Sequence, residues 1–267
     1  MNIYKFELKM LKSSILIWGL AIPLALFMYL AFFPTISADT SAFDALMENY
    51  PPELLAFFGM RPELPMSSLP GYLTITFGMM QIPIAIQAAN YGIAFLSVEE
   101  REMTADFLLS KPVSRNKILV SKFLAAFTSL TIVNILFAGT TLVAIALFKG
   151  DSVIEMNRIY VLLSTTVLFQ LFFVGIGMLI SVSVKKIASV ISYSMALGFG
   201  LYILFGLRSS VGTNFLGYIT PYAYFEPAEI LITGQYDLVY TMICVAVILF
   251  TFGMTYYLYN KRNIHSL

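Results

Sequence analysis

Long apolar stretches alternate with short polar connections along the chain, and six of these stretches are long enough to cross a bilayer. A helix needs about 20 predominantly apolar residues to span the hydrocarbon core. The six stretches cover residues 14–33, 71–97, 117–148, 159–184, 188–207 and 237–259. We therefore expect an all-α polytopic membrane protein with six transmembrane helices, in which residues 1–267 form one transmembrane domain.

The composition agrees with a chain that lies in the lipid bilayer. Hydrophobic residues make up 59% of the 267 residues and charged residues only 12%, whereas soluble domains carry about 25% charged residues. The net charge of +1 gives no electrostatic bias toward nucleic acid. Cys244 and His265 are the only residues of their types, so we expect no intrachain disulfide, no histidine-built catalytic or metal site, and no cofactor held by this chain.

Residues 1–12, MNIYKFELKMLK, have the pattern of an amphipathic helix. Lys5, Lys9 and Lys12 share one face, and apolar residues cluster elsewhere on the helix. Such a helix lies in the membrane interface with its lysines toward the headgroups, although a frayed basic flank of the first span has the same pattern. The apolar run that follows is longer than the 7–15 residues or so of a signal-peptide core, which favours an uncleaved anchor.

The distribution of basic residues predicts the orientation, because cytoplasmic connections carry an excess of lysine and arginine. With the N-terminus inside, only four of the 16 basic residues fall outside, namely Arg61, Lys149, Arg158 and Arg208. We therefore expect a multi-pass protein of the cell (plasma) membrane with both termini in the cytoplasm.

Two of the expected external segments are more than simple turns. Residues 35–70 are rich in proline and contain an apolar patch, which predicts a short helix on the outer surface. Residues 208–236 alternate turn signals with apolar pieces that are too short to span. A broken re-entrant pair of helices fits them, provided that neighbouring protein satisfies their backbone. Glu226 and Glu229 of this segment either line an exit or act at a helix N-terminus.

The most polar connection on the expected cytoplasmic side covers residues 99–117, EEREMTADFLLSKPVSRNK. Residues 107–109 are too apolar for a plain solvated loop. Pro112 interrupts a helix because proline lacks the N–H that a helix interior needs, and Ser114 offers an oxygen to cap the next helix. We expect a short helix over residues 99–113, held at the membrane surface by two spans, where a soluble partner can push it.

The polar residues within the spans are neutral amides. They are Gln81, Gln87 and Asn90 in the second stretch, Asn134 in the third and Gln170 in the fourth. They serve either as interhelical hydrogen-bonding groups, worth about 0.6–2 kcal/mol each, or as the lining of a substrate pathway. The pairs Ala85/Ala89 and Ala88/Gly92 permit close approach of another helix, either in a second subunit or within the same one.

The sequence lacks the residues of several catalytic and coupling devices. It contains no G-x-x-x-x-G-K-[ST] phosphate loop, so the chain alone cannot hydrolyse ATP. No span carries an ionisable residue near its centre, where ion-coupled carriers place one. Glu99 and Glu100 resemble the glutamate pair of some membrane-embedded proteases, but Thr104 and Ala105 stand near where their arginine would fall. We therefore expect a chain that is not itself an enzyme.

Three stretches resemble permeases of the second-type ABC exporter family. Residues 99–122 contain an acidic-basic run, Thr104, the core LLSKPVSR and a basic start to the third span. Residues 219–230, ITPYAYFEPAEI, resemble the stretch between the fifth and sixth spans, and residues 259–264, YNKRNI, resemble the tail. The likeness extends over the whole chain in span number and loop size. One departure is Met103, at a position where the family commonly has glycine.

The resemblance implies a mechanism. Two six-span subunits, identical or paralogous, each bind a separate ATPase subunit, and that subunit holds the ATP and magnesium. Closure of the ATPase dimer then pushes the cytoplasmic coupling helices and expels substrate. The residues implied in ATPase docking are Glu99, Glu100, Arg101, Glu102, Phe107, Leu108, Leu109 and Arg115. Their apolar members would fill a groove with the charges around it, unless they simply rest on lipid headgroups.

The resemblance leaves the substrate open. Apolar spans with scattered amides suit a hydrophobic or amphipathic compound, and a peptide or antimicrobial is the first candidate. Two other classes of function remain, an ion-coupled or stand-alone membrane carrier and a membrane-embedded enzyme.

Overall fold

The computed structural model describes residues 3–38, 49–101, 114–150, 152–184, 186–211 and 214–261. Its long helices are α2 (Lys12–Ala31), α6 (Leu69–Arg101), α8 (Arg115–Phe148), α9 (Met156–Ser183), α10 (Val190–Val211) and α13 (Leu238–Lys261). Its short helices are α1 (Ile3–Met10), α3 (Phe33–Ala38), α5 (Pro52–Phe57), the 3-10 helix η1 (Asn214–Tyr218), α11 (Pro221–Tyr224) and α12 (Pro227–Thr233). The part of the chain described contains helices and connections but no strand.

Six helices are long and apolar enough to cross a membrane, as the hydrophobic pattern predicts. They match the six expected stretches, and the expectation of an all-α polytopic membrane fold is confirmed. Helix α6 stays helical four residues beyond the end of its apolar stretch, as far as Arg101, and α10 continues equally far, to Val211. No proline or glycine interrupts residues 93–101, so nothing in the local sequence ends the helix at the edge of the second span.

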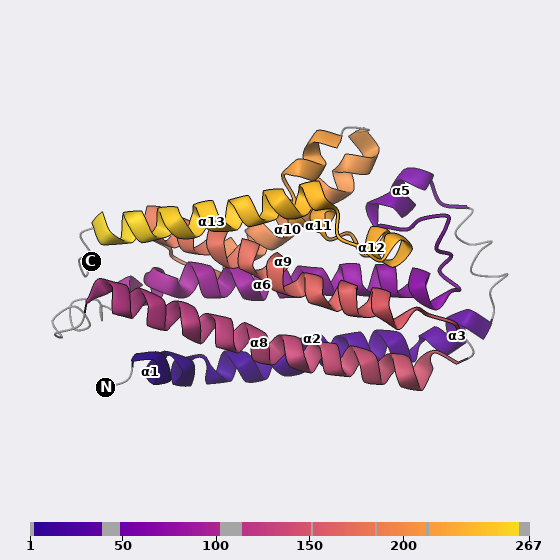
Figure 1. Ribbon diagram of the computed structural model, residues 1–267, viewed down its shortest axis with the longest axis horizontal. Coiled ribbons are helices and arrows are strands. Elements are labelled where there is room, and N and C mark those ends of the chain that lie inside the picture. The colour runs from indigo at the N-terminus through magenta and orange to yellow at the C-terminus, as the bar shows by residue number, and fades with distance from the viewer. Residues whose placement is uncertain are drawn as a thin grey trace.

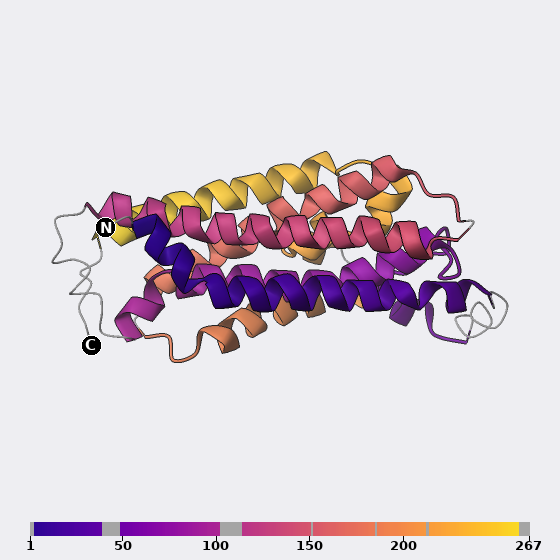
Figure 2. The ribbon, with the colours of Figure 1, turned by 90° about the horizontal axis from the view of Figure 1, so that it is seen from below.

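The six long helices pack in three layers (Figure 1). Helices α6 and α9 form the central pair, with α2 and α8 on one side and α10 and α13 on the other. Their burial agrees with this central position. Within an apolar segment of 18 residues in each span, 67% of the residues of α6 and 61% of those of α9 are buried, against 33% or less in the other four. Helix α1 and the end of α13 lie at the same end of the bundle (Figures 1 and 2).

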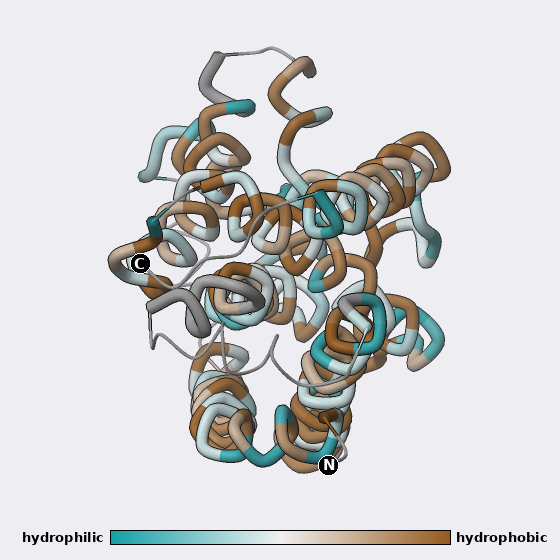
Figure 3. Tube along the Cα trace, turned by 90° about the vertical axis from the view of Figure 1, so that its left-hand side faces the viewer, coloured by the Kyte–Doolittle hydropathy of each residue, from teal (hydrophilic) through white to brown (hydrophobic). Residues whose placement is uncertain are grey.

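The outer helices carry apolar side chains on their outward faces as well as inside. Seen along the bundle in Figure 3, hydrophobic residues occur all around the helices. Large apolar side chains such as Leu20 in α2, Leu147 in α8 and Leu249 in α13 are more than 60% exposed. Helices that are hydrophobic all round are typical of membrane spans, and these faces are suited to contact lipid.

Helices α6 and α9 approach so closely that only glycine fits at two facing positions. A Cβ on Gly92 of α6 would lie 2.4 Å from the carbonyl oxygen of Val174, and a Cβ on Gly177 of α9 would lie 2.8 Å from the carbonyl oxygen of Ala89. The small residues of the second span therefore make a tight interface within one subunit, one of the two arrangements that the sequence allows.

We expect Gly92→Ala to destabilise the protein by about 1–3 kcal/mol, because the added methyl group must push α6 and α9 apart. The matched control is Gly78→Ala in the same helix, where an added Cβ meets no atom within 4 Å. That variant should be neutral or more stable by up to about 1 kcal/mol, since alanine favours helix. Thermal unfolding in detergent measures both. Equal melting temperatures for the two variants would contradict the close approach.

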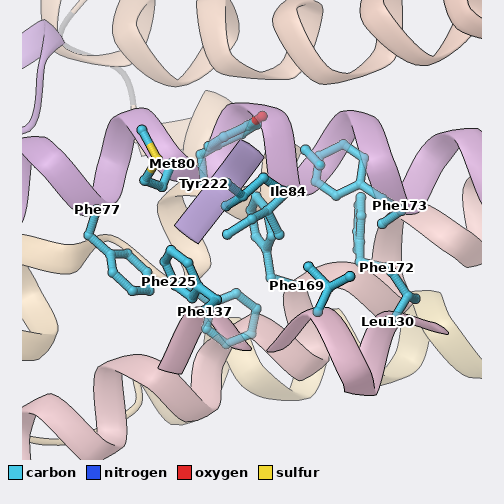
Figure 4. Close-up of a cluster of buried hydrophobic side chains, with 14 of the residues drawn as sticks. Phe77, Met80, Ile84, Leu130, Phe137, Phe169, Phe172, Phe173, Tyr222 and Phe225 are labelled. Carbon is cyan, nitrogen blue, oxygen red and sulfur yellow. The ribbon is translucent and has the colours of Figure 1, made fainter. Parts of the chain in front are cut away.

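The short helices between α10 and α13 pack into the bundle through aromatic side chains. Figure 4 shows Phe169 and Phe173 of α9 beside Tyr222 of α11 and Phe225, which lies between α11 and α12. The Tyr222 ring centroid is 5.1 Å from that of Phe169 and 5.9 Å from that of Phe173, both in edge-to-face arrangements. Residues 221–228 are all buried, so this segment is part of the core and not a surface loop.

Neighbouring side chains and helices satisfy the interrupted backbone of this segment. Gln81 of α6 donates to the Phe225 carbonyl oxygen at 2.8 Å. Arg158 of α9 donates to the carbonyl oxygens of Leu231 and Ile232, both at 2.7 Å, at the C-terminal end of α12. The positive charge of an arginine at this position also interacts favourably with the negative end of the helix dipole. The broken pair of helices expected between the last two spans is present as α11 and α12.

The proline-rich connection before α6 contains the expected short helix, α5. It starts at Pro52, two residues before the apolar patch at residues 54–59. Its Phe57 ring lies edge-on to Tyr202 of α10, with centroids 6.1 Å apart. The same ring covers Gly206 of α10, where a Cβ would come within 2.1 Å of it. Phe57 thereby holds the connection against α10.

Candidate functional site

The end of the bundle that holds both termini also holds the beginning of α8, and α1 packs against that helix (Figure 2). Glu7 of α1 forms an ion pair with Lys122 of α8, with 3.4 Å between Oε1 and Nζ. The Tyr4 and Thr128 hydroxyls are hydrogen bonded at 3.0 Å. Lys122 is 9% exposed and Glu7 16%, so the ion pair is largely shielded from water, and loss of one partner would leave the other charge in a poorly hydrated site.

The residues expected to dock an ATPase lie around the connection from α6 to α8. Glu99, Glu100 and Arg101 belong to the last turn of α6, and Arg115 is the first residue of α8. The expected cap is confirmed, because Ser114 accepts a hydrogen bond from the Lys117 N–H at the start of α8. The remaining candidates, Glu102, Phe107, Leu108 and Leu109, lie outside the described residues.

The span amides have different environments. Asn134 of α8 donates to the Gln170 side-chain oxygen of α9 at 2.7 Å, so these two join neighbouring helices. Gln81 holds the broken segment, and Asn90 is half-buried. Gln87 is fully buried, and neither polar atom of its side chain has a hydrogen-bond partner among the described residues.

Gln81→Leu is expected to lower the free energy of unfolding by about 1–3 kcal/mol, because it leaves the buried Phe225 carbonyl without a donor. Gln87→Leu makes the same change six residues further along α6, where no hydrogen bond is lost. Removing an unpartnered buried amide should be neutral or stabilising. Denaturant unfolding in mild detergent distinguishes the two variants, and a greater loss in Gln87→Leu would contradict this assignment.

A buried carboxylate with two arginine partners lies at the opposite end of the bundle. Glu226, which is 5% exposed, accepts hydrogen bonds at 2.8 Å from Arg61 on one oxygen and from Arg208 on the other. Arg61 precedes α6, Arg208 belongs to α10, and Glu226 precedes α12. The Glu226 side chain therefore connects its own segment to α10, 18 positions earlier, and to Arg61, 165 positions earlier.

The contact with Glu226 favours the charged form of Arg61. Partial burial disfavours that form, but the attraction and hydrogen bond of Glu226, together with the charges of Glu229 and Glu63, outweigh the effect of burial, so the pKa of the Arg61 guanidinium lies above its ordinary value. Glu226 occupies the position before α12 but makes no capping hydrogen bond to that helix. Its carboxylate acts instead as the shared partner of the two arginines.

A cavity of about 440 Å³ adjoins this cluster. Its charged lining residues are Arg61, Arg208, Glu226, Glu229 and Asp237. Glu229 is exposed, and Glu226 is almost entirely buried. The two glutamates of the expected external segment therefore share a cavity but differ in burial. The arginines around Glu226 are absent from the sequence-based candidates.

The family of the chain follows from its whole length. A family model described as ABC-2 family transporter protein matches residues 1–264. Among curated proteins, none matches the chain. Together with the six membrane-length helices, the match confirms the resemblance carried by the three stretches. It identifies the chain as a permease subunit of an ABC transporter, a multi-pass membrane protein whose family implies a partner ATPase. The chain belongs to the ABC-2 family of transporter proteins.

Proposed function

We propose that this permease is the membrane half of an ATP-driven exporter, and that a separate ATPase subunit binds the ATP and magnesium. The observation that carries the proposal is the ABC-2 match over residues 1–264. The basic residues support an orientation in the plasma membrane with both termini in the cytoplasm. In that orientation twelve of the 16 basic residues belong to cytoplasmic segments.

The proposed contact with the ATPase is the connection from α6 to α8. It links a central helix of the bundle to an outer one, so a push on residues 102–113 reaches both. Helix α1 is fixed to α8 through Glu7 and Lys122 at the same end, and it braces the surface on which the ATPase acts. The apolar residues at 107–109 supply the centre of the contact, and the charges of residues 99–102 and Arg115 surround it.

The proposed assembly contains two permease subunits, either two copies of this chain or this chain and a paralogue. The proposed cargo is hydrophobic or amphipathic, with peptides and antimicrobial compounds first, because the spans offer apolar surface and neutral amides and no charge near their centres.

The test is to co-express the chain with a candidate ATPase whose reading frame neighbours its own, purify the complex in lipid nanodiscs and measure hydrolysis. We expect the two chains to co-purify and ATP hydrolysis to rise above that of the ATPase alone. Transport of an amphipathic compound into inverted vesicles should then require ATP. Transport by the permease alone, driven by an ion gradient, would instead establish the stand-alone carrier.

A further inference from the structure

A groove between α8 and α9 has features of a binding site. Its volume is about 410 Å³, within the range of small-molecule sites. On α8 it extends from Phe127 to Ala138, which is roughly 16 Å at the rise of an α-helix. Its shape is therefore elongated along the bundle axis. Ile135 on its rim is 66% exposed, so the groove opens on an outward face of the bundle, where lipid lies.

The lining of the groove is apolar except for a few neutral groups, and none of its lining residues is charged. The hydroxyls of Thr131, Ser164 and Thr166 each donate to a carbonyl oxygen of their own helix. Asn134 donates to the Gln170 oxygen. The three hydroxyls and one N–H of Asn134 are therefore engaged within the protein. Because the lining carries no charge, a charged ligand would find no counter-charge.

The wall also contains a buried amide nitrogen without a partner. Gln170 is 1% exposed, and its amide nitrogen has no hydrogen-bond partner in the described part of the chain. An unpartnered amide in an apolar environment is unfavourable, so an occupant that brings an acceptor oxygen gains a net hydrogen bond, which corresponds to about tenfold in affinity. Gln170 lies near the middle of α9. The ester and phosphate oxygens of phospholipids stay at the interface, so ordinary lipid chains bring no acceptor to this depth.

We propose that the groove between α8 and α9 binds an uncharged, elongated amphipathic molecule from the lipid phase, and that an amide or ketone oxygen of this molecule accepts a hydrogen bond from Gln170. The apolar part of the molecule lies along the groove. The interpretation of the groove as a cargo site rests on the proposed export function, and it defines the class of substrate. Binding of the molecule to the groove does not depend on that function and is tested without the ATPase.

The probe is a long-chain secondary amide with an alkyl chain on each side of the amide group, so that the amide can reach the depth of Gln170, and it carries a photoreactive diazirine and an alkyne. It is compared with a hydrocarbon of equal length that carries the same two groups but no amide. The full chain is labelled in lipid nanodiscs, and the labelled peptides are identified by mass spectrometry. The amide probe should label peptides of α8 and α9, and the hydrocarbon should label them about tenfold less, the factor that corresponds to one net hydrogen bond.

Two variants test the groove independently of each other. Gln170→Leu, made together with Asn134→Leu so that the freed Asn134 amide cannot replace it, should reduce amide labelling about tenfold, down to the hydrocarbon level. Ala138→Trp leaves the amides in place but fills the groove, and it should abolish labelling. Its matched control is Ala146→Trp, because Ala146 is exposed on the same helix outside the groove. That control should label like the unaltered chain, and melting curves show whether each variant is folded.

Several results would overturn the proposal. Equal labelling by both probes, or unchanged labelling in the folded variant with Gln170→Leu and Asn134→Leu, would mean that the groove holds only lipid chains. Cross-links from this face to a second copy of the chain would mean that another subunit covers it. ATPase stimulation by the amide probe in the complete complex reports separately on export. Normal labelling without stimulation would leave the site established and the export function refuted for this compound.

Discussion

Glu226→Ala is expected to lower the free energy of unfolding by about 3–5 kcal/mol, the usual cost of removing one partner from a buried ion pair. The carboxylate is 5% exposed and Arg208 is 18% exposed, so water cannot replace the lost partner fully. Arg61 also loses the group that holds it against the bundle. The change should appear in denaturant unfolding and in loosened contact between α5 and α10.

An exposed ion pair of similar geometry provides the control. Glu155 and Arg158 are 2.8 Å apart, but Glu155 is 66% exposed. Glu155→Ala should therefore cost no more than about 1 kcal/mol, as surface pairs do. Arg158 keeps its hydrogen bonds to the end of α12 in that variant. A loss in Glu155→Ala as large as in Glu226→Ala would show that burial is not the cause.

A double-mutant cycle separates the ion pair from general damage. Arg208→Ala leaves Glu226 with Arg61 as its one remaining partner, so both single variants should be destabilised. The double variant Arg208→Ala with Glu226→Ala removes both charges, and its loss should be smaller than the sum of the single losses. An additive result would contradict coupling between the two side chains.

The six spans were predictable because length and apolar content alone define a membrane helix, and nothing elsewhere in the chain can override them. The sequence predicted that α6 packs closely against another helix, because its small residues recur four positions apart. Which helix it meets was not, because Gly92 faces Gly177 of α9 only through the folded arrangement. Local patterns predict elements and faces, whereas partners depend on tertiary packing.

The partners of charged residues were even harder to predict from the sequence. Nothing in the pattern of the N-terminal helix indicates a partner for Glu7, yet in the structure Glu7 forms an ion pair with Lys122. Glu226 and Arg61 are 165 positions apart, so no spacing rule connects them. A lone acidic residue next to an apolar run, or a lone arginine in an external loop, is the signal that was available.

The two glutamines of α6 show why a residue type does not define a role. Gln81 and Gln87 have the same side chain and similar burial, and both count equally as pathway candidates by sequence. In the structure one holds the interrupted backbone at Phe225, whereas the other has no partner in the part described. Roles in this core depend on where backbone carbonyls are left unpaired, which only the fold determines.

Phe107→Asp and Leu108→Asp are expected to weaken association with the ATPase by at least about 30-fold each. This corresponds to the roughly 2 kcal/mol or more that a central apolar anchor contributes to an interface. Both residues lie in the connection from α6 to α8, outside the described residues. A carboxylate in an apolar groove is left desolvated and unpaired, so co-purification and stimulated hydrolysis should be lost together.

Leu54→Asp is the matched control for this last experiment. Leu54 is an apolar residue of α5 that is 42% exposed at the opposite end of the bundle, and the substitution adds the same charge (Figure 1). It should leave ATPase binding unchanged, because an ATPase at the end of the termini cannot reach it. If Leu54→Asp abolished association while Phe107→Asp preserved it, the ATPase would bind the other end, and the proposed orientation of the permease would be reversed.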